Sequence, residues 1–88
     1  MERSEIRTAN DVYEFVEQLK AACLEKGAVE LYKQFNDSMR LGSSGLEILG
    51  AIRGTIIANR KEIEGILGLG AREDIDHIIV FVNRAYGR

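Results

Sequence analysis

Apolar side chains recur every three or four residues along most of the chain, which is the period of an amphipathic α-helix. The first such segment begins near Thr8 or Asn10, either of which can act as the N-cap, and it ends before Gly27. The second segment runs from about residue 28 to residue 40. The residues predicted to face inward are Val12, Phe15, Val16, Leu19, Ala22 and Cys23 in the first helix and Leu31, Tyr32, Phe35 and Met39 in the second.

A third helix is predicted to begin at Ser44, because Ser44 and Glu47 form the Ser-x-x-Glu pattern of a capping box. Its apolar pattern fails at Asn59, which would fall on the buried side of an unbroken helix. A continuous helix and a kink or break near Asn59 therefore both stay open, and Asn59 with Glu62 would cap the continuation after a break. The apolar positions are Leu46, Ile48, Leu49, Ile52, Ile56, Ile57, Ile63, Ile66 and Leu67.

The last helix is predicted from about Ala71 to Ala85, after a glycine-rich turn over residues 65–70. A strand is the alternative for Ile78–Val82, since this stretch is rich in β-branched residues. No second segment offers it a partner strand, and the helical period fits better than alternation. The residues predicted to be buried are Ile75, Ile78, Ile79, Val82 and Tyr86.

These segments predict an all-α fold, a small up-and-down bundle of four helices whose third helix is kinked or broken near Asn59. Proline is absent and the connections are short, so consecutive helices are expected to run antiparallel. A chain of 88 residues can build one hydrophobic core, which predicts a single domain over residues 1–88 with residues 1–7 frayed. Dimerisation would add stability to so small a bundle.

The third predicted helix is apolar on two sides. Opposite its core positions lie Gly50, Gly54 and Ala58, flanked by Leu46 and Ile57. Each helical glycine costs about 1 kcal/mol relative to alanine, which indicates that something approaches the backbone there. One interpretation is intramolecular, with the first or last helix crossing closely. The other is that these five residues form a homodimer or partner interface.

Groups that carry chemistry are few and dispersed. His77 is the only histidine and Cys23 the only cysteine, so neither a metal cluster nor a Cys–His pair is expected. The stretch Gly42–Gly45 leads into a helix N-terminus and could hold an anion, but it lacks the Lys-Ser/Thr of a phosphate-binding loop. The sequence therefore predicts no catalytic residue, no metal site and no cofactor. The carboxylates around the glycine-rich turn, which would make a solvated acidic patch, are Glu62, Glu64, Glu73, Asp74 and Asp76.

Charge and composition limit the classes of partner and the cellular location that we expect for this chain. The chain has 12 Lys and Arg against 14 Asp and Glu, with the cations scattered, so nucleic-acid binding is not expected. The longest apolar run, Ile78–Val82, is far shorter than the roughly 18 residues that a membrane span needs. A single cysteine and the absence of a leading apolar segment predict a cytoplasmic protein.

The segment LGSSGLEILGAIRG, Leu41–Gly54, resembles a motif of small bacterial helical-bundle proteins of uncharacterised function. In that motif Gly-Ser-Ser/Thr leads into Glu-Ile-Leu and then into an Ile/Leu-Arg pair. The resemblance implies a bacterial helical bundle and brings no catalytic residues. We therefore expect a non-enzymatic protein-interaction module, in one form immunity- or antitoxin-like. The alternative is a structural or regulatory bundle that self-associates as a homodimer.

Overall fold

The computed structural model describes residues 6–41 and 44–87. Within these ranges the chain forms helices and no strand, which confirms the all-α prediction. The four-helix count is not confirmed, because the third predicted helix is divided into two at Asn59. The described helices are α1 (Ala9–Lys26), α2 (Val29–Leu41), α3 (Gly45–Ala58), α4 (Arg60–Leu67) and α5 (Ala71–Ala85).

Local capping sets the ends of α1. The Thr8 side chain accepts a hydrogen bond from the Asp11 N–H, and the Asp11 carboxylate accepts one from the Thr8 N–H at 2.9 Å. This is the reciprocal capping box, so Thr8 is the N-cap and Asn10 lies inside the helix. Gly27 ends α1 in the left-handed region at φ 76°, and the Ala28 N–H donates to the Cys23 carbonyl at 2.8 Å.

Asn59 separates α3 from α4, which confirms the break as one of the two options that the sequence left open. Its side chain does not cap α4. Instead, the Asn59 amide donates to the Thr55 carbonyl at 2.9 Å and to Oε1 of Gln34 in α2 at 2.8 Å. Asn59 therefore ends α3 and links the junction between α3 and α4 to α2. No side-chain hydrogen bond caps the start of α4.

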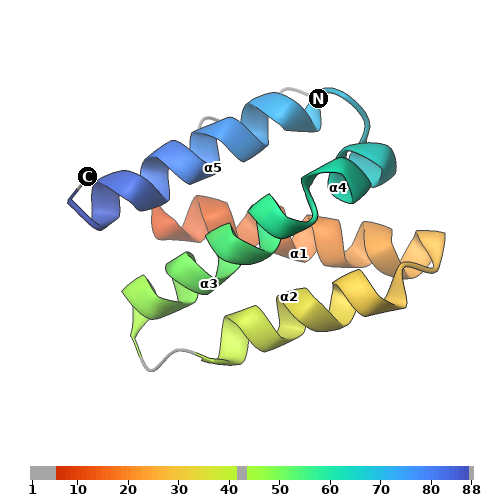
Figure 1. Cartoon of the computed structure of the whole chain (residues 1–88), viewed down its shortest axis with the longest axis horizontal. Coiled ribbons are helices and arrows are strands. Elements are labelled where there is room, and N and C mark those ends of the chain that lie inside the picture. The colour runs from red at the N-terminus through yellow and green to blue at the C-terminus, as the bar shows by residue number, and fades with distance from the viewer. Residues whose placement is uncertain (1–5, 42–43, 88) are drawn as a thin grey trace.

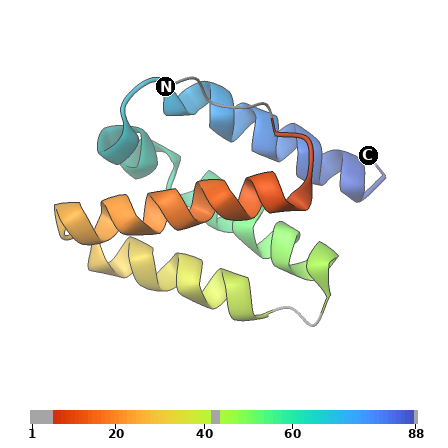
Figure 2. The same ribbon diagram turned by 180° about the vertical axis from the view of Figure 1, so that it is seen from behind.

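The four longer helices alternate in direction, and α4 forms a short corner between α3 and α5 (Figure 1). Seen from behind, α1 crosses in front of the other helices (Figure 2), so α3 and α1 lie on opposite faces of the molecule. Helix α3 contacts α2 along one side and α5 along the other. The face of α3 that points away from α1 is therefore the one left without a covering helix.

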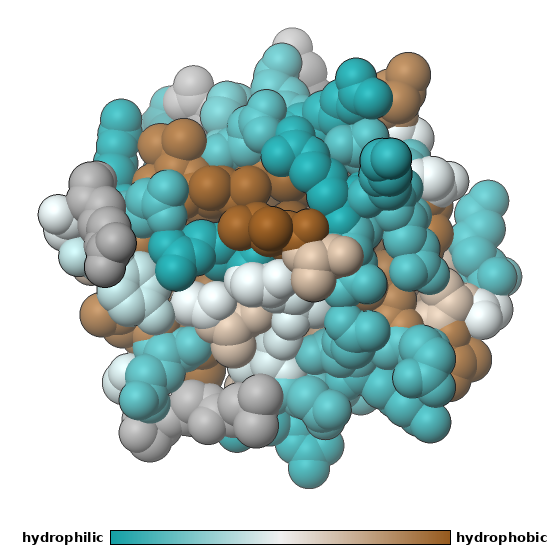
Figure 3. All heavy atoms as spheres, viewed as in Figure 1, coloured by the Kyte–Doolittle hydropathy of each residue, from teal (hydrophilic) through white to brown (hydrophobic). Residues whose placement is uncertain are grey.

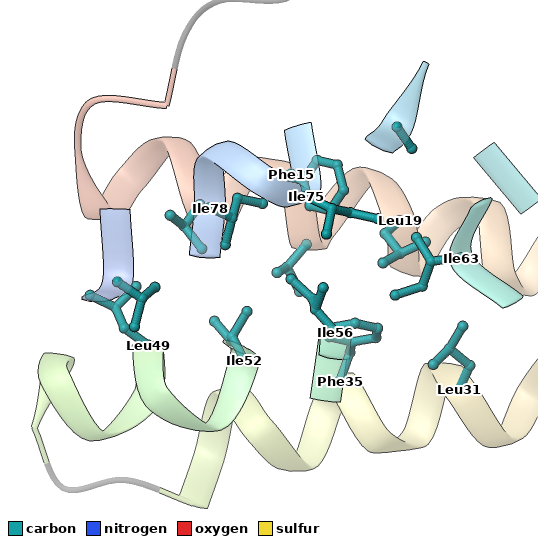
Figure 4. Packing of buried hydrophobic residues seen from close by; sticks show 14 of the residues in the cluster. Phe15, Leu19, Leu31, Phe35, Leu49, Ile52, Ile56, Ile63, Ile75 and Ile78 are labelled. Atoms are coloured by element: carbon teal, nitrogen blue, oxygen red, sulfur yellow. The ribbon is translucent and has the colours of Figure 1, made fainter. Parts of the chain in front are cut away.

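The core fills the space between α1 and the remaining helices, where aliphatic and aromatic side chains converge from both sides (Figure 4). Tyr86, which the sequence places in the core, is instead 38% exposed, and Ile79 is only partly buried. The buried apolar residues are Val12, Phe15, Val16, Leu19, Cys23, Leu31, Phe35, Leu49, Ile52, Ile56, Ile63, Ala71, Ile75, Ile78 and Val82.

One polar side chain joins α2 to α3 inside this packing. Ser38 is 3% exposed, and its hydroxyl donates to the Gln34 carbonyl at 2.9 Å. The Ser38 and Thr55 hydroxyl oxygens lie 2.6 Å apart, so with the Ser38 hydrogen directed at Gln34 the Thr55 hydroxyl donates to the Ser38 oxygen. The Ala51 carbonyl, 3.0 Å from the Thr55 oxygen, is the alternative acceptor for Thr55. These bonds satisfy both buried hydroxyls and set which side of α3 faces α2.

Candidate interaction surface

Four of the five residues predicted for an interface lie exposed on α3. We call Leu46, Gly50, Gly54, Ile57 and Ala58 the outer face of α3. Leu46 is 40% exposed and Ile57 is 55% exposed, and Gly54 and Ala58 are exposed as well. In the space-filling view, pale and brown atoms run across the middle of the surface where α3 lies, between teal regions (Figure 3). The outer face is thus a weakly polar band with polar borders.

Gly50 is the exception, because α5 reaches over it. The Tyr86 side chain covers Gly50 so closely that a Cβ on residue 50 would overlap the Tyr86 hydroxyl. That hydroxyl donates a hydrogen bond of 2.9 Å to the Leu46 carbonyl. Gly50 therefore supports the intramolecular interpretation, and the helix that crosses closely is the last one.

Arg53 completes this contact between α3 and α5. Its guanidinium lies over the Tyr86 ring, 5.1 Å from the ring centre, and donates to the side-chain carbonyl of Asn83. A cation over an aromatic face and a side-chain hydrogen bond each stabilise the contact. Sequence reasoning missed the roles of Tyr86 and Asn83, because they are separated from α3 by 30 to 40 residues and show no local pattern.

Gly54 has no such neighbour. A Cβ built on Gly54 meets no atom within 4 Å among the described residues. Its backbone is not in the left-handed region, since the described glycines with positive φ are Gly27, Gly68 and Gly87. No contact or conformation within the described chain therefore requires glycine at position 54.

A shallow hollow lies where α3 turns into α4. It has a volume of about 360 Å³ and is lined by Ile57, Ala58, Asn59, Arg60, Lys61 and Glu62. Ile57 and Ala58 belong to the outer face, and the exposed Lys61 stands beside them. The outer face thus adjoins charged side chains of both signs, Lys61 and Glu62, at the end nearest α4.

Ion pairs join several of the charged side chains near the glycine-rich turn. Arg60 bonds Glu64 at 3.2 Å and Asp76 at 2.7 Å, and Arg72 bonds Glu64 at 3.0 Å. The hydrogen bond from Arg72, followed by the one from Arg60, lowers the pKa of Glu64 below its ordinary value, although desolvation acts against it. Glu64 and Asp76 of the predicted acidic patch are therefore paired with arginines, and these pairs link α4 to α5.

The groups considered for chemistry lie apart. Cys23 is fully buried in the core, and burial, with a smaller contribution from Glu62, raises the pKa of its thiol. His77 is exposed on α5, beside a hollow of about 220 Å³ that is also lined by Ile6, Val80, Phe81 and Arg84. Among the described residues, no three or more His, Cys, Asp and Glu side chains are grouped to hold a metal ion.

The Ser-x-x-Glu start of α3 is used as a cap. The Ser44 hydroxyl accepts a hydrogen bond of 3.2 Å from the Glu47 N–H. Gly42 and Ser43, the rest of the anion-binding candidate, lie outside the described residues. None of the described helices combines the length and apolar content needed to cross a membrane. The chain matches no protein-family model, no curated protein and no solved structure.

Proposed function

We propose that this chain is a non-enzymatic protein-interaction module that binds its partner through the outer face of α3. The observation that carries the proposal is the exposure of Ile57, at 55%, one helical turn from the open Gly54. Removing apolar surface from water contributes about 25 cal/mol for each Å² buried, so association through this face is favourable.

The cost of Gly54 supports the same proposal. A glycine in the middle of a helix costs about 1 kcal/mol relative to alanine, mainly in conformational entropy. At Gly50 the close approach of Tyr86 accounts for that cost. At Gly54 no described atom comes close enough to account for the cost. A second protein that packs closely against the α3 backbone would account for it. Ala58 lies one turn after Gly54 and is also exposed, and its small side chain leaves room for a partner to approach Gly54.

The charge pairs near α4 bear on the kind of partner. An immunity- or antitoxin-like module that masks a basic toxin needs exposed, unpaired carboxylates. Glu64 and Asp76 are bonded by arginines of the same chain, so less acidic surface is available than the sequence indicates. These ion pairs therefore favour an apolar contact through α3 over binding of a basic toxin by exposed carboxylates.

Size-exclusion chromatography of an extract from the producing cells tests the proposal. We expect the wild-type chain to elute well above its own mass of 9.8 kDa and Gly54→Leu to elute close to it. The leucine fits the chain itself, because position 54 has open space and ordinary helical backbone. It would, however, hold a partner away from the helix.

Gly65→Leu is the matched control. Gly65 is also an exposed glycine within a helix, with no described atom within 4 Å of a built Cβ, but it lies in α4 outside the outer face. This variant should elute like wild type. A wild-type chain that elutes as a monomer in the extract, or equal effects of the two leucines, would overturn the proposal.

A further inference from the structure

The Tyr86 side chain covers one end of the outer face of α3. Gly50, Gly54 and Ala58 follow one another at intervals of four residues, so they lie along the same side of the helix. A Cβ on Gly54 would meet no described atom within 4 Å, whereas a Cβ on Gly50 would overlap the Tyr86 hydroxyl. The small-residue side of α3 is therefore open at Gly54 and closed at Gly50.

Tyr86 is held in place by contacts at the surface. It is 38% exposed and follows the end of α5, whereas the last buried residue of that helix is Val82. Its hydroxyl donates a hydrogen bond of 2.9 Å to the Leu46 carbonyl, and the Arg53 guanidinium lies over its ring. Within the described chain, Tyr86 belongs neither to the buried core nor to the partly buried residues packed against it. Moving this side chain therefore breaks contacts with α3 and leaves the core packed.

Little else is lost when the Tyr86 side chain moves away. The Leu46 carbonyl keeps the hydrogen bond that an α-helix gives it from the N–H four residues later, and the Tyr86 hydroxyl bonds water. Arg53 keeps its hydrogen bond to Asn83 of α5, so the two helices stay joined. Exposed side chains change rotamer within picoseconds to nanoseconds. The closed and open positions of Tyr86 therefore differ by surface contacts and exchange rapidly.

We infer that Tyr86 is an autoinhibitory latch, which closes over Gly50 in the isolated chain and must open before a partner packs along the full outer face. This inference rests on the proposed function and adds how access to its surface is controlled. The Tyr86 ring and a partner that approaches the α3 backbone at Gly50 cannot occupy the same space. When a ligand binds only the open state, its apparent affinity is reduced by the fraction of molecules that are open.

Truncation of Tyr86 tests the latch, because removal of an inhibitory side chain strengthens binding, whereas removal of a contact residue weakens it. The assay is size-exclusion chromatography of the cell extract, at a dilution at which the wild-type chain is only partly bound. We expect Tyr86→Ala to raise the apparent affinity about tenfold, as for a latch that is open in roughly one molecule in ten. Tyr86→Phe, which keeps the ring and loses the hydrogen bond to Leu46, should raise it by a smaller factor.

Two further variants are the controls. Val80→Ala also truncates an exposed apolar side chain near the end of α5, but Val80 lines the hollow beside His77 and not the outer face. Its binding should match wild type. Gly54→Leu should abolish binding in the Tyr86→Ala background as it does alone, because the gain must use the same surface. Circular dichroism checks that each variant is folded.

The outcomes separate the latch from the proposed function. A complex that is lost with Gly54→Leu but is weakened or unchanged by Tyr86→Ala overturns the latch and leaves the interaction module standing. A gain with Tyr86→Ala that Gly54→Leu does not remove also overturns the latch, because it would come from another surface. A wild-type chain that elutes as a monomer overturns the proposed function and the latch with it. If Tyr86→Ala does not fold, the sign of the Tyr86→Phe effect decides.

Discussion

The Tyr86 side chain lies directly over Gly50, and its hydroxyl bonds the carbonyl of the residue one turn earlier, Leu46. The first residue after α5 thus closes against the first half of α3. Because a Cβ at position 50 would overlap the Tyr86 hydroxyl, Tyr86 can take this position only while residue 50 is glycine. This contact predicts that Gly50→Ala has opposite effects on stability in the presence and in the absence of the Tyr86 side chain.

Gly50→Ala should destabilise the protein by about 1–2 kcal/mol, because displacing Tyr86 outweighs the helix propensity of alanine. In a Tyr86→Ala background the same substitution should stabilise by up to about 1 kcal/mol, since position 50 is then an ordinary helical site. Urea unfolding of the four proteins in this cycle measures both effects. If Gly50→Ala has the same sign in both backgrounds, Tyr86 does not occupy the space over Gly50.

Ser38→Ala should cost about 1 kcal/mol, because it removes a buried hydroxyl that bonds both Gln34 and Thr55. Thr55→Val should cost a similar amount. The two substitutions together should cost less than their sum, since each single change leaves the other hydroxyl short of a partner. Thermal or urea unfolding of the double-mutant cycle checks this coupling, and simple additivity would contradict the hydrogen bond between the two side chains.

Stability should fall in acid through the ion pairs between α4 and α5. The pKa of Glu64 is lowered in the folded chain, so its contribution is complete above the unfolded pKa, near 4.5, and is lost as the pH falls through the folded pKa. The urea midpoint of Glu64→Gln should therefore lie below that of wild type at pH 7 and converge with it near pH 3.

The exposed Glu25 provides the control for this pH dependence. Glu25→Gln should follow the wild-type decline with pH. A constant difference between wild type and Glu64→Gln at every pH would mean that Glu64 acts through packing and not through its charge. Asp11, whose pKa is lowered first of all by hydrogen bonds from the backbone N–H groups of Arg7 and Thr8, should supply part of the acid sensitivity that remains.

Cys23 should be unreactive in the folded protein. Its side chain is fully buried, and burial raises the pKa of the thiol, so the reactive thiolate is scarce at neutral pH. We expect a disulfide reagent to modify it at least about a hundredfold more slowly than in the urea-unfolded chain, because access requires opening of the core. Cys23→Ala combined with Ala21→Cys, which moves the thiol to an exposed position of α1, should react rapidly.

The sequence determined the helices, because the signals that specify them are local. Thr8 with Asp11, Gly27 and Ser44 mark helix ends through contacts with residues at most a few positions away, and the structure uses each of them. The apolar period identified most of the buried residues for the same reason, since the side of a helix on which a residue lies follows from its spacing. It missed Ser38 and Ala71, which are buried as well. Asn59 interrupted the apolar period, and the structure ends α3 before this residue and begins α4 after it.

Only the tertiary structure decided what lies against each of those helices. Tyr86 continues the apolar stripe of α5 and was expected in the core, but it rests on Gly50, 36 positions away along the chain. Gly50 and Gly54 of α3 look equivalent in sequence, yet Gly50 is covered and Gly54 is open. Ser38, Asn83 and Arg72 likewise find partners on other helices. Periodicity and capping act within one helix, whereas the closest neighbours of a side chain depend on how separate helices are brought together.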